Sequence, residues 1–115
     1  MLARVWRLNS PSHFSFVYRR GHKLNSPGVF VWVVKTPMSV QHTKIAVVVS
    51  KQVNKKAVVR NLYKRQILAV ISQILPTIPI KNYLFVLSVK PDISKLTTKE
   101  LKISLLTVFS KILNN

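Results

Sequence analysis

Acidic side chains are almost missing from this sequence. Asp92 and Glu100 are the only two among 115 residues, against 19 lysines and arginines, which gives a formal net charge of +17 at pH 7. A two-metal nuclease site needs several carboxylates to hold its ions, and general acid–base catalysis needs two suitable groups within reach of the substrate. Two acids near the end of the chain cannot form such a site. We therefore predict no catalytic residue and no metal site in this protein.

Other absences narrow the function further. There is no cysteine, which excludes disulfides and thiolate metal sites, and with only two glycines there is no glycine-rich phosphate loop. The three histidines, His13, His22 and His42, lack the spacing of a metal-binding motif. No segment reaches about 18 uncharged apolar residues, and the first residues lack the apolar run of a signal peptide. We expect no membrane span and a cytoplasmic location.

Positive charge is in excess, together with enough apolar residues to form a core. Hydrophobic residues make up 48% of the chain, and the length suits one small domain over residues 1–115. A charge of +17 repels itself and favours a polyanionic partner. Nucleic acid is the first candidate partner, and an anionic membrane surface is the second.

The excess of basic over acidic side chains is clearest in residues 55–75. We predict that this stretch is one helix, because no Gly or Pro interrupts it before Pro76. At about 100° per residue its polar and apolar side chains fall largely on opposite sides. Solvated helix faces usually mix charges of both signs, whereas this helix has no acid to pair with. We predict that the polar side meets an anion and that the other side packs on the protein. The polar side comprises Arg60, Asn61, Lys64 and Arg65, and the apolar side comprises Val59, Leu62, Tyr63, Val70 and Ile74.

The rest of the chain predicts an α+β fold. Ser10-Pro11 is typical of a helix start and Gly21 of its stop, while Thr97 and Glu100 form a capping box before a final helix. Strands are predicted over residues 29–34, 44–50 and 83–89, with a turn at 25–28 and a hairpin between the first two strands. The order is α-β-β-α-β-α, a mixed sheet packed by helices. Both faces of the strand at 29–34 are apolar, so alternation alone does not show which one is buried.

The spacing of basic residues resembles a known family. Ser50-Lys51, the run from Lys55 to Asn61 and Lys64-Arg65 are similar to the signature of the bacterial ribonuclease P protein component. Arg7-Leu8 followed by Phe14, Tyr18 and Gly21 is similar to the first helix of that family. The resemblance extends over essentially the whole chain. Two departures are Leu62 and Leu68, which stand where arginines are common in that family.

The resemblance implies a fold like that of ribosomal S5 domain 2 and a function as the protein subunit of a ribonucleoprotein endoribonuclease. The protein would bind ribonuclease P RNA and precursor tRNA, with no obligate protein partner, and would assist RNA-catalysed hydrolytic removal of the 5′ leader. Mg²⁺ would be held mainly by the RNA. By position, the RNA-binding residues are Lys51, Lys55, Lys56, Arg60, Asn61, Lys64 and Arg65, and the leader-cleft residues are Phe14, Tyr18 and Trp32.

Two other functions fit the sequence in part. A structural RNA-binding protein of ribosomal type would share the size, charge and fold, but it would not need an aromatic cleft for a single strand. A cationic membrane-surface protein would concentrate its basic residues on one amphipathic helix. Here the apolar residues are spread over all the predicted strands and helices, as a folded core requires.

Overall fold

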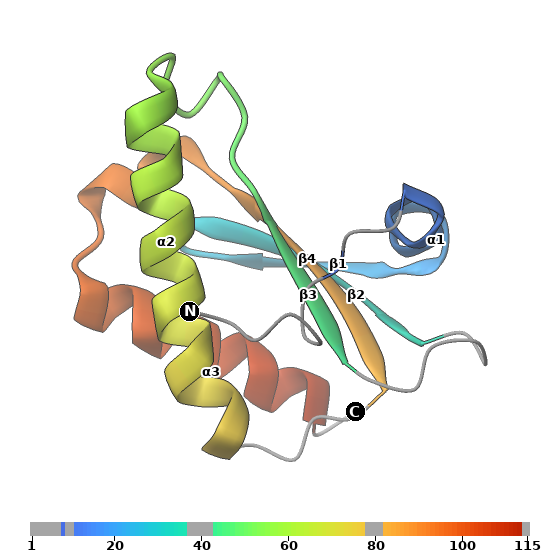
Figure 1. Ribbon diagram of the computed structural model, residues 1–115. Coiled ribbons are helices and arrows are strands. Elements are labelled where there is room, and N and C mark those ends of the chain that lie inside the picture. Colours follow the sequence, from blue (N-terminus) through green and yellow to red (C-terminus); the bar gives the residue numbers. More distant parts are fainter. Residues whose placement is uncertain (1–7, 9–10, 37–42, 78–81, 114–115) are drawn as a thin grey trace.

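A four-stranded mixed sheet separates helix α1 on one side from helices α2 and α3 on the other (Figure 1). The computed structural model describes residues 8, 11–36, 43–77 and 82–113. The elements follow the order α1 (Pro11–Arg20), β1 (His22–Ser26), β2 (Val29–Lys35), β3 (Lys44–Val48), α2 (Ala57–Ile74), β4 (Tyr83–Val89) and α3 (Thr98–Leu113). Short 3₁₀ turns at Leu75–Thr77 and Pro91–Lys95 follow α2 and β4. The predicted α+β class is confirmed.

The strand order is β1-β2-β4-β3, and this corrects the predicted hairpin. β2 pairs antiparallel with β1 on one side and with β4 on the other, so neither edge of β2 is left for β3. β3 instead lies parallel to β4, and α2 connects the two. The two-residue turn Pro27-Gly28 closes the β1–β2 pair locally, whereas residues 36–43 separate β2 from β3. The shorter loop costs less entropy to close.

β1 is absent from the sequence prediction, which had assigned Asn25 and Ser26 to a turn. Its sequence, His22-Lys23-Leu24-Asn25-Ser26, is mostly polar and has little intrinsic strand preference. Pairing with the strongly β-forming β2 makes it a strand. The turn itself is confirmed at Pro27-Gly28, where Gly28 has φ 84°, a conformation that favours glycine.

Alternation along β2 places Val29, Val31 and Val33 on one face of the sheet and its aromatic residues with Val34 on the other. Val29, Val31 and Val33 face α2 and α3 in the main core, which we call the inner face. Main-core partners from the helices are Ile67, Val70, Ile71 and Ile74 of α2 and Leu101, Leu105, Val108, Phe109 and Ile112 of α3. Trp32 and Val34 lie on the outer face, where Leu8, Val17, Leu84 and Val86 form a second, smaller cluster beneath α1.

The helix boundaries agree closely with the prediction. α1 begins at Pro11 and ends before Gly21, whose N–H donates to the Val17 carbonyl at 2.8 Å. Ser10, the predicted cap, lies outside the described residues. α2 begins at Ala57, two residues later than predicted, because Asn54 and Lys55 form a turn that ends in an extended Lys56. The capping box of α3 is confirmed: Thr97 N–H donates to Glu100 Oε1 at 3.0 Å, and Glu100 N–H donates to Thr97 Oγ1 at 3.1 Å.

Candidate nucleic-acid interface

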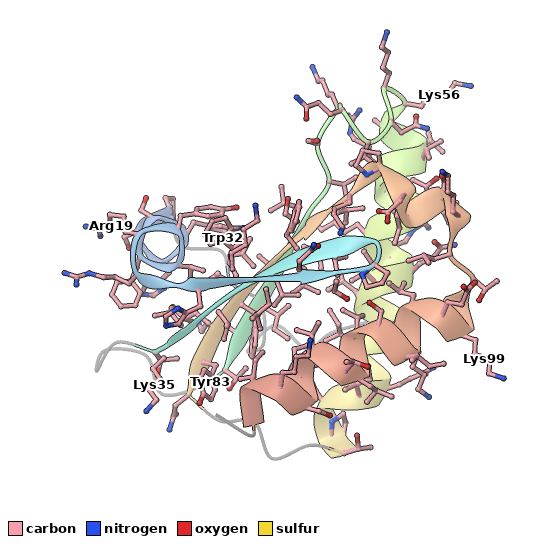
Figure 2. The ribbon with its side chains drawn as sticks, turned by 180° about the vertical axis from the view of Figure 1, so that it is seen from behind. Arg19, Trp32, Lys35, Lys56, Tyr83 and Lys99 are labelled. Atoms are coloured by element: carbon pink, nitrogen blue, oxygen red, sulfur yellow. The ribbon has the colours of Figure 1, made fainter. Side chains whose placement is uncertain are left out.

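The N-terminal half of α2 projects beyond the sheet and carries most of the predicted RNA-binding residues. The buried residues of α2 all lie in its second half, from Ile67 onward. In Figure 2, Lys56 stands at the far tip of this projecting end. Five other predicted residues are likewise exposed, on the same half of the helix or on the turn before it: Lys51, Lys55, Asn61, Lys64 and Arg65. The structure therefore brings the predicted basic residues onto one projecting end.

The backbone at this end adds to the positive potential. The first N–H groups of a helix point outward and carry a partial positive charge. The first turn of α2 contains no acidic residue, and Lys56 makes no side-chain capping hydrogen bond. Lys55 and Lys56 therefore add to the helix dipole rather than offsetting it. This costs stability in the free protein and favours an anion at the same place.

Arg60 has a structural role that the sequence prediction missed. Its Nη1 donates to the backbone carbonyls of Asn54 at 3.0 Å and Lys55 at 2.9 Å. Asn54 in turn accepts the Lys56 N–H through Oδ1 at 2.9 Å. Arg60 is half-buried, unlike its neighbours Asn61 and Lys64. Its guanidinium therefore holds the turn before the helix against the helix itself.

Leu62 lies on the exposed side of α2, contrary to the prediction that it packs with the apolar side. It is 44% exposed, and Val58, one turn earlier, is 77% exposed. This half of the helix extends past the sheet, and Tyr63 packs against the main core whereas Val58 and Leu62 stay exposed. The outward side of the projecting end is therefore partly apolar, with Asn61 and Arg65 beside Leu62.

A second candidate surface lies on the outer face, where α1 leaves part of the sheet exposed. The rings of Tyr18 and Trp32 meet edge to face with their centroids 5.3 Å apart. Tyr18 is 44% exposed, and Trp32 is half-buried on the small cluster. Partial burial raises the pKa of the Tyr18 phenol. Phe14, the third predicted cleft residue, packs against the same cluster.

Four further residues belong to this surface, Lys23, Asn25, Phe30 and Lys90, and sequence reasoning did not assign them to it. Lys23 Nζ lies 3.9 Å from the centroid of the Phe30 ring and 5.5 Å from that of Trp32. Lys90 Nζ lies 4.7 Å from the Phe30 ring and donates to Asn25 Oδ1 at 2.6 Å. Lys23 and Asn25 stand opposite Trp32 and Phe30 in the β1–β2 pairing. Their position could be found only after β1 was recognised as a strand.

The residues present do not fit a magnesium site. Among the residues that the structure describes, no three of the His, Asp and Glu side chains gather closely enough to hold a metal ion. Glu100 is engaged in the capping box, whose hydrogen bonds lower the pKa of its carboxyl. Asp92 lies exposed in the 3₁₀ turn Pro91–Lys95.

Comparison with known families decides what kind of chain this is. The model of the family Ribonuclease P matches residues 2–113. This chain belongs to the ribonuclease P protein family. The ribonuclease P protein component of Rippkaea orientalis is 35% identical over 97 residues, which cover 82% of this chain and 76% of that protein. That of Synechococcus elongatus is 36% identical over 70 residues, which cover 59% of this chain and 57% of that protein.

Solved structures of the ribonuclease P protein family share the fold. The Staphylococcus aureus RNase P protein superposes with a TM-score of 0.78 at 21% identity, over 93% of this chain and 94% of that one. The Thermotoga maritima RNase P protein superposes with a TM-score of 0.75 at 22% identity, over 89% of this chain and 93% of that one. The predicted family and fold class are both confirmed. No helix in the described part of this family member is long and apolar enough to cross a bilayer.

Proposed function

We propose that this chain is the protein subunit of ribonuclease P and that it binds both the catalytic RNA and the 5′ leader of precursor tRNA. The projecting end of α2 contacts phosphates of the catalytic RNA. The outer-face residues Tyr18 and Trp32 hold the single-stranded leader. The RNA and its Mg²⁺ ions supply the hydrolysis.

The observation that carries this proposal is the half-exposed aromatic pair Tyr18–Trp32 beside Lys23. Leaders vary in sequence, and an aromatic ring can stack on any base because every base has a π-face. A nearby ammonium group can contact phosphates without reading the sequence. A purely structural RNA-binding protein would not need such a surface, so the pair favours a role in holding a strand.

The two surfaces suit two different kinds of RNA. The end of α2 is basic and lacks aromatic side chains other than Tyr63, so it suits the regular phosphate backbone of a folded RNA. The outer face combines rings with lysines, so it suits an unpaired strand. α2 and α1 lie on opposite sides of the sheet (Figure 1), which lets one protein contact both RNAs at once.

Reconstitution tests the proposal. The protein is mixed with a ribonuclease P RNA and precursor tRNA at a Mg²⁺ concentration too low for the RNA to act well alone. We expect faster cleavage at the correct 5′ site than with RNA alone. RNA binding without any gain in cleavage would instead support a structural RNA-binding protein of ribosomal type.

A further inference from the structure

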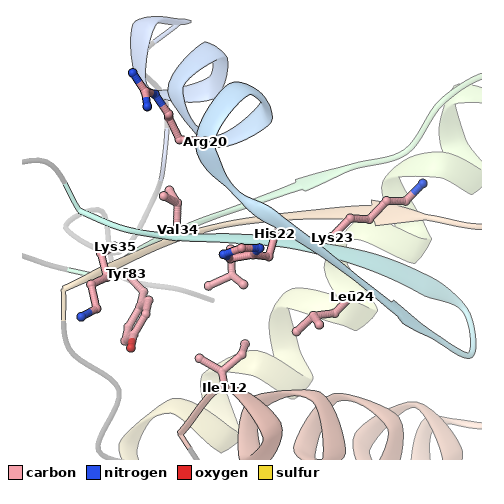
Figure 3. A pocket seen from close by; sticks show the side chains of 9 residues that line it. Arg20, His22, Lys23, Leu24, Val34, Lys35, Tyr83 and Ile112 are labelled. Carbon is pink, nitrogen blue, oxygen red and sulfur yellow. The ribbon is translucent and has the colours of Figure 1, made fainter. Parts of the chain in front are cut away.

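A cavity of about 690 Å³ opens on the inner face, at the end of the sheet beside β1. Figure 3 shows His22, Leu24, Tyr83 and Ile112 around one space between the sheet and the end of α3. None of the leader or RNA-binding residues named above lines it except Lys23. The described residues lining the cavity are Arg20, His22, Lys23, Leu24, Val33, Val34, Lys35, Tyr83 and Ile112.

The lining combines an apolar floor with a basic rim. Leu24, Val33 and Ile112 provide aliphatic surface, and the Tyr83 ring stands beside them. Two basic side chains lie beside this floor, His22 and Lys35, whereas the side chains of Arg20 and Lys23, which also line the cavity, extend away from it (Figure 3). Asp92 and Glu100, the only acids in the chain, lie elsewhere, in the turn after β4 and at the start of α3. The cavity therefore suits a ligand with a flat apolar part and negative charge, and its volume lies within the usual range for ligand sites.

Lys23 connects this cavity to the leader surface. Its backbone belongs to β1, the strand at one edge of the sheet. Its Nζ lies 5.5 Å from the centroid of the Trp32 ring on the outer face. Arg20, at the end of α1, follows Tyr18 by two residues and also lines the cavity. Basic side chains thus continue from the Tyr18–Trp32 pair around the β1 edge to the inner face.

We propose that the cavity holds a nucleotide of single-stranded RNA, namely a distal leader nucleotide whose strand has already crossed the outer face. This inference rests on the proposed function. The base lies on Leu24 and Ile112 beside the Tyr83 ring, and its phosphates meet Lys35 and His22. The basic side chains beside the floor come from two different strands, β1 and β2, so they match successive phosphates of a chain better than the single phosphate group of a free nucleotide.

Leader length provides the test. Precursor tRNAs with leaders of increasing length are bound to holoenzymes containing wild-type, Lys35→Gln or His22→Ala protein. Both side chains are exposed, so neither change disturbs the core. We expect the longest leaders to bind the wild type more tightly than short ones, and each variant to lose roughly three- to ten-fold of that added affinity. Binding of the shortest leaders should not change.

Lys99→Gln is the matched control, because it removes the same charge from an exposed lysine at a distant point of the surface (Figure 2). A photoreactive uridine in the distal leader should crosslink to Leu24 or Tyr83, whereas one near the cleavage site should not. The inference is overturned if the added affinity of longer leaders is unchanged in Lys35→Gln and His22→Ala, or if Lys99→Gln reduces that added affinity equally. Uridine 5′-monophosphate bound in the cavity without any effect of the variants on leader length would also overturn it, in favour of a free-nucleotide site.

A failure of this inference can be distinguished from a failure of the proposed function. Loss of the length effect concerns only long leaders. A failure of the proposed outer-face role would appear as Trp32→Ala having no effect on precursor tRNA with any leader.

Discussion

At the scale of single residues, Trp32 is the most informative position for leader binding. Trp32→Ala should weaken binding of precursor tRNA to the holoenzyme by about 1–3 kcal/mol, or roughly 5- to 150-fold, because one stacking ring is lost. Binding of mature tRNA, which has no leader, should change little. Equilibrium binding of both tRNAs measures the difference.

The control for Trp32 is Phe16→Ala. Phe16 packs against the same small cluster from α1 but does not belong to the Tyr18–Trp32 pair. It should lower stability without selecting between precursor and mature tRNA. If Trp32→Ala weakens both tRNAs equally, as a general packing defect would, the ring has only a core role.

Lys64 and Arg60 lie about one turn apart on α2, but their substitutions should have different effects on RNA affinity and stability. Lys64→Ala should reduce the slope of log affinity for ribonuclease P RNA against log salt by about one, because one phosphate contact is lost. Its thermal stability should be unchanged, since Lys64 is exposed. Arg60→Ala should flatten the slope and also lower stability by about 1 kcal/mol, because two carbonyls lose their donor.

Salt titrations and thermal unfolding of the free protein give the two readouts. Wild-type salt dependence in Lys64→Ala would mean that this side of α2 is only solvated. An Arg60→Ala protein with unchanged stability would show that its carbonyl contacts contribute nothing measurable to the fold.

At the scale of elements, the start of α3 depends on a reciprocal cap. Thr97→Ala should destabilise the protein by about 1 kcal/mol, as removal of an N-cap hydroxyl usually does. The hydrogen bonds of the cap lower the pKa of Glu100. The ionised form therefore contributes stability above the unfolded-state pKa, and this contribution is lost as pH falls through the folded-state pKa.

Glu100→Gln should thus reduce the acid-side dependence of stability on pH, while stability well below the folded pKa should approach that of the wild type. Urea unfolding over a series of acidic pH values makes the comparison. An unchanged pH profile in Glu100→Gln would exclude this carboxyl as a source of acid sensitivity.

The junction between α1 and the sheet depends on the absence of a side chain at Gly21. A Cβ at this position would lie 2.4 Å from the Val17 carbonyl oxygen and 3.0 Å from that of Val33, both of which are backbone atoms. Gly21→Ala should therefore cost about 1–3 kcal/mol, through a shift of α1 against β2. Because α1 carries Tyr18, precursor binding should weaken as well, which thermal unfolding and tRNA binding together would detect.

At the scale of the whole molecule, the shortage of acids leads to a prediction about the protein without its RNA. Protein purified free of RNA should not cleave precursor tRNA at any Mg²⁺ concentration, because two acids are too few to hold catalytic metal ions. Gel analysis after nuclease-free purification tests this. Robust metal-dependent cleavage that co-purifies with the protein and is lost with its unfolding would contradict the assignment of chemistry to the RNA.

Much of the molecule is determined by local sequence. The ends of α1, the capping box of α3 and the strong strand signals at β2, β3 and β4 depend on neighbouring residues, and each was predicted to within about two residues. The family and the positions of the basic residues are also readable, since a fixed spacing on a helix fixes which side chains share a side.

Tertiary structure decided the rest, because the deciding contacts join residues far apart in the sequence. His22–Ser26 becomes a strand only through β2, and β3 pairs with β4 rather than β2 because β2 already has two neighbours. The Arg60 side chain bonds the turn before α2, a contact outside the helix. Leu62 is exposed because α2 extends beyond the sheet that would otherwise cover Leu62. Both faces of β2 are equally apolar in sequence. Only the placement of α2 and α3 on one face and the single α1 on the other leaves Trp32, and not Val29, Val31 and Val33, partly open to a ligand.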